Sequence, residues 1–461
     1  MSSPRAPRAS LCTLGCKVNQ YETRETAADL LRLGYRLVPF GQPADVCVVN
    51  TCSVTHEADA KSRAALRRGA RAGGNPLVVA TGCYVETAPQ AVAAIAGVAA
   101  VIPNAEKPRL ADIVDETLRR SGRLLFPAAD DDDPEQLLPA HGSDELISLL
   151  RNAAGTVGRT RAVIKIQDGC NHFCTFCIIP MTRGRLRSRD SAAVLAEAQE
   201  LAAQGFSELV LTGICIGDYG DEKGQPEQTR DPLAELITRL AEIPGVQRLR
   251  LSSVDPADVT DDLIHTMAET PQACPHLHLS LQAGSDDVLH RMRRRYNAAE
   301  FRALVERIYA AMPGAGLTGD VIVGFPGETP EQFAETVRLC EDSGFCKLHV
   351  FPYSVRTGTQ AARWADDVLP AEKQRRVREL SRVSDQLGLA FAERHVGETV
   401  EVLAEQRDRH SGLMNGLTRN YLRVYFEADD AVRGHTVQVL VESAAPDGAS
   451  GVLRSVPQEG S

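Results

Sequence analysis

Residues 167–189 read QDGCNHFCTFCIIPMTRGRLRSR, and this stretch contains Cys170, Cys174 and Cys177. Their C-x3-C-x2-C spacing brings three thiols onto one short loop and supplies no fourth. A cuboidal [4Fe-4S] cluster held by three thiolates keeps one iron open to a small molecule, which separates a catalytic cluster from an electron carrier. Zinc is the alternative, but a structural zinc site needs four ligands, and no second C-x2-C pair lies nearby. The loop therefore predicts a cluster with an open iron.

The cysteine loop lies within a series of short apolar runs and helical patterns that begins near Arg159. Six of the runs have the length and composition of buried parallel strands. They are AVIKI, ELVLTG, RLRLSS, HLHLSL, GLTGDVIVG and KLHVFPY. Six such units predict a partial (β/α)6 barrel over residues 159–390. Active sites of these barrels lie at the carboxyl ends of the strands, and the cysteine loop directly follows the first run.

Residues 9–126 show a shorter pattern of the same kind, which predicts a small open parallel α/β sheet. Cys16, Cys52 and Cys83 stand at the carboxyl ends of three predicted strands, SLCTLG, DVCVVN and LVVAT. Because such strand ends share one edge of a parallel sheet, the three thiols are expected to converge. They predict a second three-cysteine cluster. Three buried thiols are the alternative, since free cysteine is commonly buried.

The remaining segments have different compositions. Residues 127–158 are acidic and contain prolines, which predicts a solvated linker. Residues 394–456 contain alternating runs such as ETVEVLAE and HTVQVLVES without helical patterns between them, which predicts a small antiparallel β-barrel. The predicted fold class is thus α/β with three parts: an N-terminal open parallel domain, a central partial barrel and a C-terminal small β-barrel.

Composition limits the class of protein. The chain has 461 residues, a net charge of -10 and 12 cysteines, and these cysteines are too dispersed for a small disulfide scaffold. Four of them, Cys215, Cys274, Cys340 and Cys346, are interpreted as structural or incidental. The N-terminus lacks the apolar core of a signal peptide, and no apolar run spans a bilayer, so no membrane partner is expected. We expect a cytoplasmic protein in a reducing compartment.

The stretch 167–189 resembles the signature of radical S-adenosylmethionine (SAM) enzymes, and of their methylthiotransferase branch almost throughout. The resemblance extends from about residue 9 to about residue 456. It implies two [4Fe-4S] clusters and SAM as cofactors, with all six cysteines named above as cluster ligands and catalytic residues. In that family SAM cleavage at the open iron yields a 5'-deoxyadenosyl radical, and the N-terminal cluster holds the sulfur to be inserted. NGLTRNYLRVYF resembles the TRAM domain, an RNA-binding barrel.

Three branches of that family are plausible, two acting on tRNA adenosine and one on a ribosomal protein. TLGCKVNQYET, NTCSVTHEADAKSR and IPNAEK resemble the branch that acts on N6-threonylcarbamoyladenosine beside the anticodon, at tRNA position 37. This implies the anticodon stem-loop as partner and an external reductant such as flavodoxin or ferredoxin. The alternative within the class acts on isopentenyladenosine. A two-cluster electron-transfer protein with an RNA-binding tail is the alternative from another class.

The resemblance also suggests contacts for SAM and RNA. The SAM candidates lie beside the last cluster cysteine or at strand ends: Phe176, Ser252, Gln282, Gly324 and Phe351. A tight turn is the alternative for Gly324, and a barrel-core aromatic is the alternative for Phe351. The RNA candidates combine basic groups with an aromatic, as phosphate contact and base stacking require: Arg183, Arg185, Arg187, Arg419, Tyr421 and Arg423. Solvated charges or pairing with carboxylates are the alternatives for the arginines.

Overall fold

The computed structural model describes residues 6–122, 160–220 and 230–456. The chain divides into two compact units. The N-terminal unit contains residues 1–158 together with 178–185, and the barrel unit contains residues 159–177 together with 186–461. The acidic linker predicted at residues 127–158 lies outside the described residues. The segment that follows Cys177 therefore belongs to a different unit from the cysteine loop itself.

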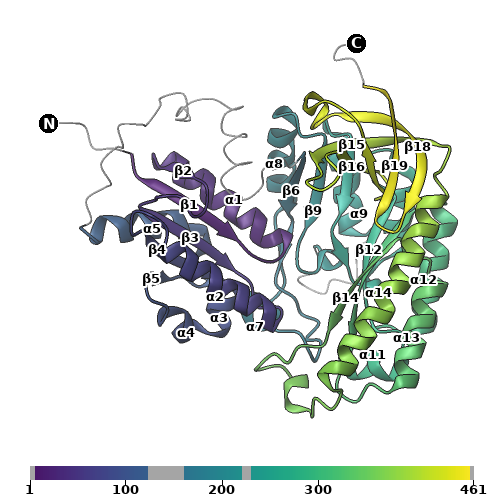
Figure 1. Cartoon of the computed structure of the whole chain (residues 1–461), viewed down its shortest axis with the longest axis horizontal. Coiled ribbons are helices and arrows are strands. Elements are labelled where there is room, and N and C mark those ends of the chain that lie inside the picture. Colours follow the sequence, from purple (N-terminus) through teal and green to yellow (C-terminus); the bar gives the residue numbers. More distant parts are fainter. Residues whose placement is uncertain (1–5, 123–159, 221–229, 457–461) are drawn as a thin grey trace. The chain divides into compact units, whose positions relative to one another are not determined.

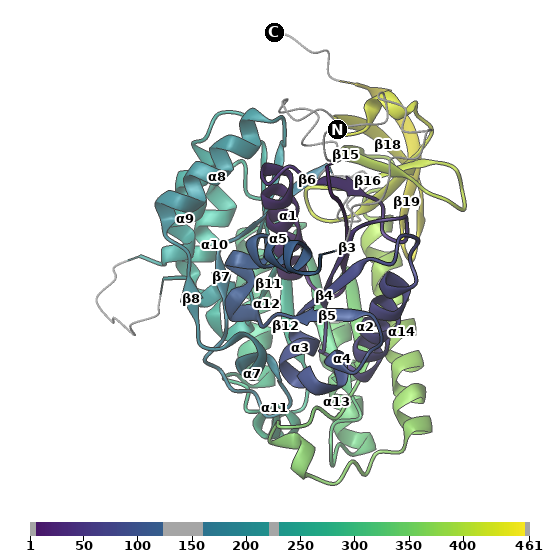
Figure 2. The ribbon, with the colours of Figure 1, turned by 90° about the vertical axis from the view of Figure 1, so that its left-hand side faces the viewer.

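The N-terminal unit contains a parallel five-stranded sheet with strand order β2-β1-β3-β4-β5, as the sequence pattern predicts (Figure 1). Figure 2 shows β3, β4 and β5 side by side. The strands are β1 (Arg8–Thr13), β2 (Arg36–Val38), β3 (Val46–Thr51), β4 (Leu77–Gly82) and β5 (Val98–Val101). The strands β2 and β5 at the two edges are only three and four residues long, and the sequence pattern does not predict them.

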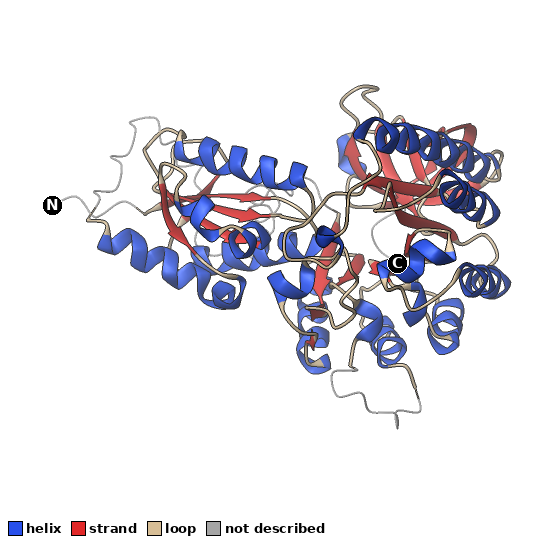
Figure 3. Cartoon of the chain, turned by 90° about the horizontal axis from the view of Figure 1, so that it is seen from below, coloured by secondary structure: helices blue, strands red, loops and turns tan. Residues whose placement is uncertain are grey.

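Helices cover both faces of this sheet (Figure 3). Successive side chains of a strand point to opposite faces, so Val46 and Val48 pack on one face while Cys47 and Val49 pack on the other. The first face is covered by α1 (Lys17–Arg32) and α5 (Leu110–Arg120). The second is covered by α2 (His56–Ala70), α3 (Cys83–Thr87) and α4 (Pro89–Ala93). Burial on both faces explains why β3 and β4 are continuous apolar runs.

The barrel unit contains six parallel strands where the sequence predicts them. They are β6 (Arg161–Lys165), β9 (Glu208–Thr212), β10 (Arg248–Leu251), β12 (His276–Gln282), β13 (Gly316–Val323) and β14 (Lys347–Pro352). Hydrogen bonding divides them into a three-stranded sheet, β10-β9-β6, and a four-stranded sheet, β11-β12-β13-β14. The short strand β11 (Ser253–Val254) follows β10 after one residue and pairs with β12, so the two sheets form one interrupted arc.

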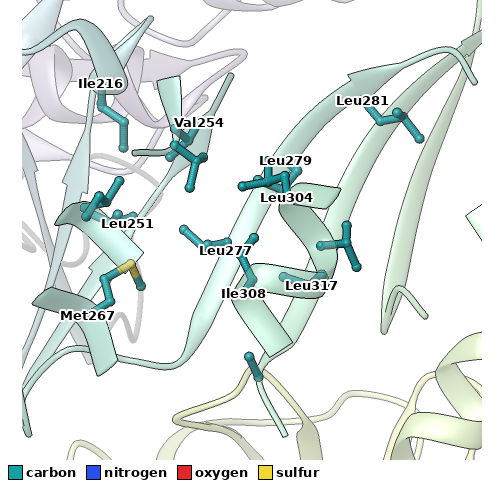
Figure 4. Packing of buried hydrophobic residues seen from close by; sticks show 14 of the residues in the cluster. Ile216, Leu251, Val254, Met267, Leu277, Leu279, Leu281, Leu304, Ile308 and Leu317 are labelled. Carbon is teal, nitrogen blue, oxygen red and sulfur yellow. The ribbon is translucent and has the colours of Figure 1, made fainter. Parts of the chain in front are cut away.

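Helices surround the convex side of this arc. They are α8 (Ser191–Ala203), α9 (Pro232–Ala241), α10 (Asp261–Glu269), α11 (Asp286–Met292), α12 (Ala298–Ala311), α13 (Pro330–Asp342) and α14 (Pro370–Glu393). The leucines of β12, Leu277, Leu279 and Leu281, point away from the lumen and share a core with Leu304 and Ile308 of α12 (Figure 4). The alternate positions of β12 are polar, so the lumen of the barrel is polar.

The C-terminal strands close into a small barrel with the order β15-β16-β17-β19-β18. They are β15 (Thr399–Arg407), β16 (Met414–Thr418), β17 (Arg423–Phe426), β18 (Thr436–Ala445) and β19 (Gly448–Ser455). Four of the strand pairs are antiparallel, as in the predicted small antiparallel barrel, and one pair, β17 with β19, is parallel. The 3-10 helix η6 (Asp430–Val432) connects β17 to β18, and β19 lies between these two strands in the barrel.

The small barrel docks on the amino-terminal ends of the larger barrel's strands. Glu208 of β9 is fully buried and bonds Arg250, which also donates to the backbone carbonyls of Thr418 and Arg419. Arg248 bonds Glu401 at 2.7 Å. Buried arginines between carboxylates and carbonyls form a polar interface that satisfies its own charges. Throughout the described ranges, no helix is long and apolar enough to cross a membrane.

Candidate functional site

The cysteine loop, residues 169–177, is fixed at both ends by hydrogen bonds within the barrel unit. Gln167 is fully buried, donates to the carbonyl of Gly169 at 2.6 Å and accepts from the backbone amides of Ile214 and Cys215, both at 2.8 Å. Near the other end, Thr175 donates to the carbonyl of Arg291 at 2.8 Å. The loop is therefore held against the segment that follows β9 and against the last turn of α11, at the carboxyl ends of the strands.

The three loop thiols are half-buried, and two of them receive hydrogen bonds from nitrogen. The backbone amide of His172 lies 3.4 Å from the sulfur of Cys170. The guanidinium of Arg294 lies 3.3 Å from the sulfur of Cys174. N–H donors directed at cysteine sulfurs are a feature of iron–sulfur sites, because they stabilise the negative charge on a thiolate-bound cluster. Three partly accessible thiols on one fixed loop, with such donors, fit a [4Fe-4S] cluster.

A polar cluster that the sequence pattern does not indicate lies beside Cys170. His172 and Asp218 are joined at 2.6 Å, and the sulfur of Cys215 lies 3.6 Å from His172 and 3.5 Å from Asp258. A hydrogen bond from Cys215 lowers the pKa of Cys170 to about 6, which favours the thiolate that binds iron. Cys215 is thus a member of the site, which corrects its interpretation as structural. Its position shortly after the end of β9 is the signal that could identify it.

The SAM candidates lie at the carboxyl ends of neighbouring strands or beside the loop. Ser252 follows β10 and is buried, and its hydroxyl has no hydrogen-bond partner among the described residues. A buried polar atom without a partner is rare in native proteins and indicates a bound ligand or water. Gln282 ends β12 with a φ of 65°, beside a register shift in the pairing with β13. These two side chains fit a polar cofactor at the strand ends.

The other three SAM candidates have different surroundings. Phe176 is half-buried and packs edge-on against Phe325, with ring centroids 6.3 Å apart. Phe351 is 42% exposed, so the barrel-core alternative does not describe it. Gly324 has a φ of 71°, and a Cβ there would lie 2.4 Å from the side chain of Lys373. That close approach supports the tight-turn alternative for Gly324, with the glycine required by packing.

In the N-terminal unit, Cys16, Cys52 and Cys83 lie at the ends of three adjacent strands. Cys16 is the N-cap of α1, Cys52 directly follows β3, and Cys83 opens α3 after β4. Burial raises the pKa of Cys52 to about 11, and the nearby Cys83 and Cys16 contribute to the increase. Gly15 has a φ of 95°, and a Cβ there would lie 2.8 Å from the Cys52 sulfur. Sequence-distant thiols are therefore neighbours, as a three-thiolate cluster requires.

Buried charges lie next to these thiols. Glu22 bonds both Lys107 and Arg183, and the side chains of all three are less than 10% exposed. Arg183 also bonds the side chain of Asn19. The predicted RNA contact of Arg183 is therefore corrected, because its buried guanidinium bonds Glu22 and Asn19 inside the N-terminal unit. Arg185 and Arg187 are exposed, so their RNA contacts stay predictions.

The RNA candidates of the small barrel also need correction. Tyr421 stacks on His276 with ring centroids 4.1 Å apart, and Arg419 donates to the carbonyls of Gln247 and Ala273, each at 3.2 Å. Both side chains therefore dock the small barrel on the larger one. Arg423 is 34% exposed and lies 3.6 Å from Glu405, so it retains accessible surface for a phosphate.

Two family models match the chain. The radical SAM superfamily matches residues 164–340, and the family UPF0004, described as uncharacterized, matches residues 8–103. Among solved structures, a radical SAM methyltransferase, TsrM from Kitasatospora setae, superposes with a TM-score of 0.54 at 15% identity, covering 76% of this chain and 72% of that one. That similarity supports the fold alone.

Curated relatives are similar over almost the whole chain. The threonylcarbamoyladenosine tRNA methylthiotransferase MtaB of Bacillus subtilis (strain 168) is 40% identical, covering 94% of this chain and 93% of the relative. The protein of the same name from Thermotoga maritima is 33% identical, with 93% of both chains covered. A tRNA-2-methylthio-N(6)-dimethylallyladenosine synthase of Mycolicibacterium paratuberculosis is 36% identical, covering 94% of this chain and 84% of the relative.

Proposed function

The chain belongs to the tRNA-modifying methylthiotransferases of the radical SAM superfamily, and we propose that it converts N6-threonylcarbamoyladenosine at tRNA position 37 to its 2-methylthio derivative. The observation that carries this proposal is the 40% identity over 435 residues to a relative named for that substrate. The site supports the same chemistry, because cysteine thiols gather at the strand ends of both units. The related dimethylallyladenosine enzyme makes isopentenyladenosine the second candidate substrate.

We assign the cysteines of the two units to different tasks. Cys170, Cys174 and Cys177 would hold a [4Fe-4S] cluster whose open iron binds SAM, and that group supplies a 5'-deoxyadenosyl radical when bound. Ser252 and Gln282 would orient the polar groups of SAM, and Phe176 would border its adenine. Cys16, Cys52 and Cys83 would hold a second cluster, which carries the sulfur that is transferred.

The partners follow from this assignment. Reductive SAM cleavage requires one electron from outside the chain, so we propose a low-potential carrier such as flavodoxin or ferredoxin. The tRNA anticodon stem-loop would contact exposed basic side chains, for which Arg185, Arg187 and Arg423 are the remaining candidates. A cytoplasmic location accords with a tRNA substrate and with oxygen-sensitive clusters.

The decisive experiment is mass spectrometry of tRNA nucleosides from a host that lacks its own methylthiotransferases. Expression of this chain should produce 2-methylthio-N6-threonylcarbamoyladenosine, and Cys174→Ala should produce none. Cys340→Ala is the matched control, because Cys340 is fully buried in the hydrophobic core, and it should retain the product. A methylthio group on isopentenyladenosine instead would show that isopentenyladenosine, and not N6-threonylcarbamoyladenosine, is the substrate. Absence of any methylthio nucleoside, with iron loaded in both units, would contradict the proposed function and favour the electron-transfer alternative.

A further inference from the structure

Arg294 is directed at the cysteine loop by the way α11 ends. The helix stops at Met292, and Arg293 adopts a left-handed conformation with a φ of 60°. The amide of Arg293 bonds the carbonyl of His290, and the amide of Arg294 bonds the carbonyl of Leu289, each at 2.9 Å. This pair of bonds is the Schellman motif, which usually places glycine at the left-handed position. An arginine there is a strained choice, and such strain is concentrated at functional sites.

The turn separates two adjacent arginines into different environments. Arg293 is exposed and bonds the side chain of Gln360. The side chain of Arg294 is 5% exposed, bonds Asp255 at 2.6 Å and donates to the carbonyl of Ser280 at 3.0 Å. Its guanidinium also lies 5.2 Å from the ring centre of Tyr296. These contacts fix the guanidinium, and its other terminal nitrogen lies 3.3 Å from the Cys174 sulfur.

We propose that Arg294 is a positioning residue that donates an N–H hydrogen bond to the Cys174 sulfur and thereby raises the reduction potential of the cluster held by the cysteine loop. The inference rests on the cluster assignment made under the proposed function. Reduction adds negative charge to a cluster and its sulfurs, and a hydrogen bond to a sulfur stabilises the reduced form. Because the guanidinium is buried, this bond acts in a medium of low dielectric, where it is stronger than in water.

Because Arg294 is paired with Asp255, the position of its N–H group should affect the reduction potential of the cluster more than its positive charge does. The carboxylate compensates much of the positive charge of Arg294, so the distant field of the pair is small. The directed N–H group acts at contact distance and is not compensated in the same way. Arg294→Lys keeps the positive charge but has only one side-chain nitrogen. Lysine cannot bond Asp255 and Cys174 with two separate nitrogens, so this variant should lose much of the increase in reduction potential.

The test is a potentiometric titration of the full-length chain without SAM, followed by electron paramagnetic resonance of the reduced cluster. Replacing Cys16, Cys52 and Cys83 by alanine restricts iron to the cysteine loop. In that background, Arg294→Met should lower the ratio of reduced to oxidised cluster about tenfold at a fixed potential, which corresponds to a shift of about 59 mV for one electron. Arg294→Lys should shift the potential in the same direction. Arg293→Met removes the same charge one residue away and should leave the potential unchanged.

The outcomes separate this inference from the proposed function. Equal potentials for Arg294→Met and the parent would overturn the hydrogen-bond role, and so would equal shifts for Arg294→Met and Arg293→Met. A variant that binds SAM more weakly at an unchanged potential would make Arg294 a cofactor ligand instead. Should Arg294→Met fail to fold because Asp255 loses its partner, the double variant Asp255→Asn/Arg294→Met removes both charges and carries the same expectation. Absence of iron in the parent would refute the cluster itself.

Discussion

Cys47 and Cys52 are five residues apart and both buried, yet they have different neighbours. Cys47 lies inside β3 and is fully buried in the core, whereas Cys52 lies beyond the end of the strand beside Cys16 and Cys83. We expect Cys52→Ala to remove the iron of the N-terminal unit, to spare formation of 5'-deoxyadenosine and to abolish methylthiolation. Iron content, SAM cleavage and tRNA nucleosides, measured on one preparation, check this prediction.

Cys47→Ala is the control for that variant, because it removes a thiol from the same part of the sheet. It should retain the full iron content and the product, with only a modest loss of stability from the missing sulfur. If Cys52→Ala kept its methylthio product, the second-cluster assignment would be wrong. If both variants lost iron equally, the loss would reflect damage to the sheet.

At the scale of elements, α7 (Ile179–Arg183) belongs to the N-terminal unit, where its buried Arg183 pairs with Glu22 and Asn104 donates to the carbonyl of Thr182. Arg183 bonds Glu22 at 2.9 Å, and its side chain is 1% exposed. Loss of one partner from a buried ion pair typically costs about 3 to 5 kcal/mol. We expect Arg183→Met to lower the free energy of unfolding by an amount of that order, measured by denaturant titration.

Arg185→Met is the comparison that separates stability from RNA binding. Arg185 is exposed, so its replacement should leave the unfolding free energy within about 0.5 kcal/mol. It should instead weaken tRNA binding, and more strongly at low salt, since phosphate contacts are salt-dependent. A normal tRNA affinity for Arg185→Met, together with a normal unfolding curve for Arg183→Met, would contradict both roles.

These elements also show what the sequence can predict. The central strands and the positions of the six cysteines proposed as cluster ligands follow from local patterns, because apolar runs mark buried strands and these six cysteines come after predicted strands. The partner of a charged side chain does not follow from any local pattern. Glu22 and Arg183 are separated by 161 residues, and Arg250 and Thr418 by 168. The sequence therefore does not distinguish arginines that stabilise the fold, such as Arg183 and Arg419, from an exposed arginine such as Arg185.

At the scale of the whole molecule, the small barrel is an integral part of the barrel unit. Its residues 417–419 accept hydrogen bonds from Arg248 and Arg250, both of which are nearly completely buried. Deletion of residues 394–461 would expose these arginines and remove their partners. A truncation therefore cannot separate RNA binding from stability, and a point variant such as Arg423→Gln is the better test of the barrel's contribution to tRNA affinity.

Glu208 gives this interface a predicted response to acid. Burial opposes ionisation of its carboxyl group, but Arg250 and Arg161 hold its pKa at about 2, below the ordinary value of 4.5. A depressed pKa stabilises the folded state above pH 4.5, and this contribution is lost as the pH falls toward 2. The full contribution is about 3 kcal/mol. Glu208→Gln should be less stable than the wild type at pH 7, and the difference should shrink by about 1.4 kcal/mol between pH 7 and pH 3.5, because the rest of the contribution is lost only nearer pH 2. Denaturant unfolding of the two proteins at pH 7 and pH 3.5 measures it, with Glu269→Gln, an exposed carboxylate change, as the control. A difference that does not depend on pH would show that Glu208 acts through packing alone.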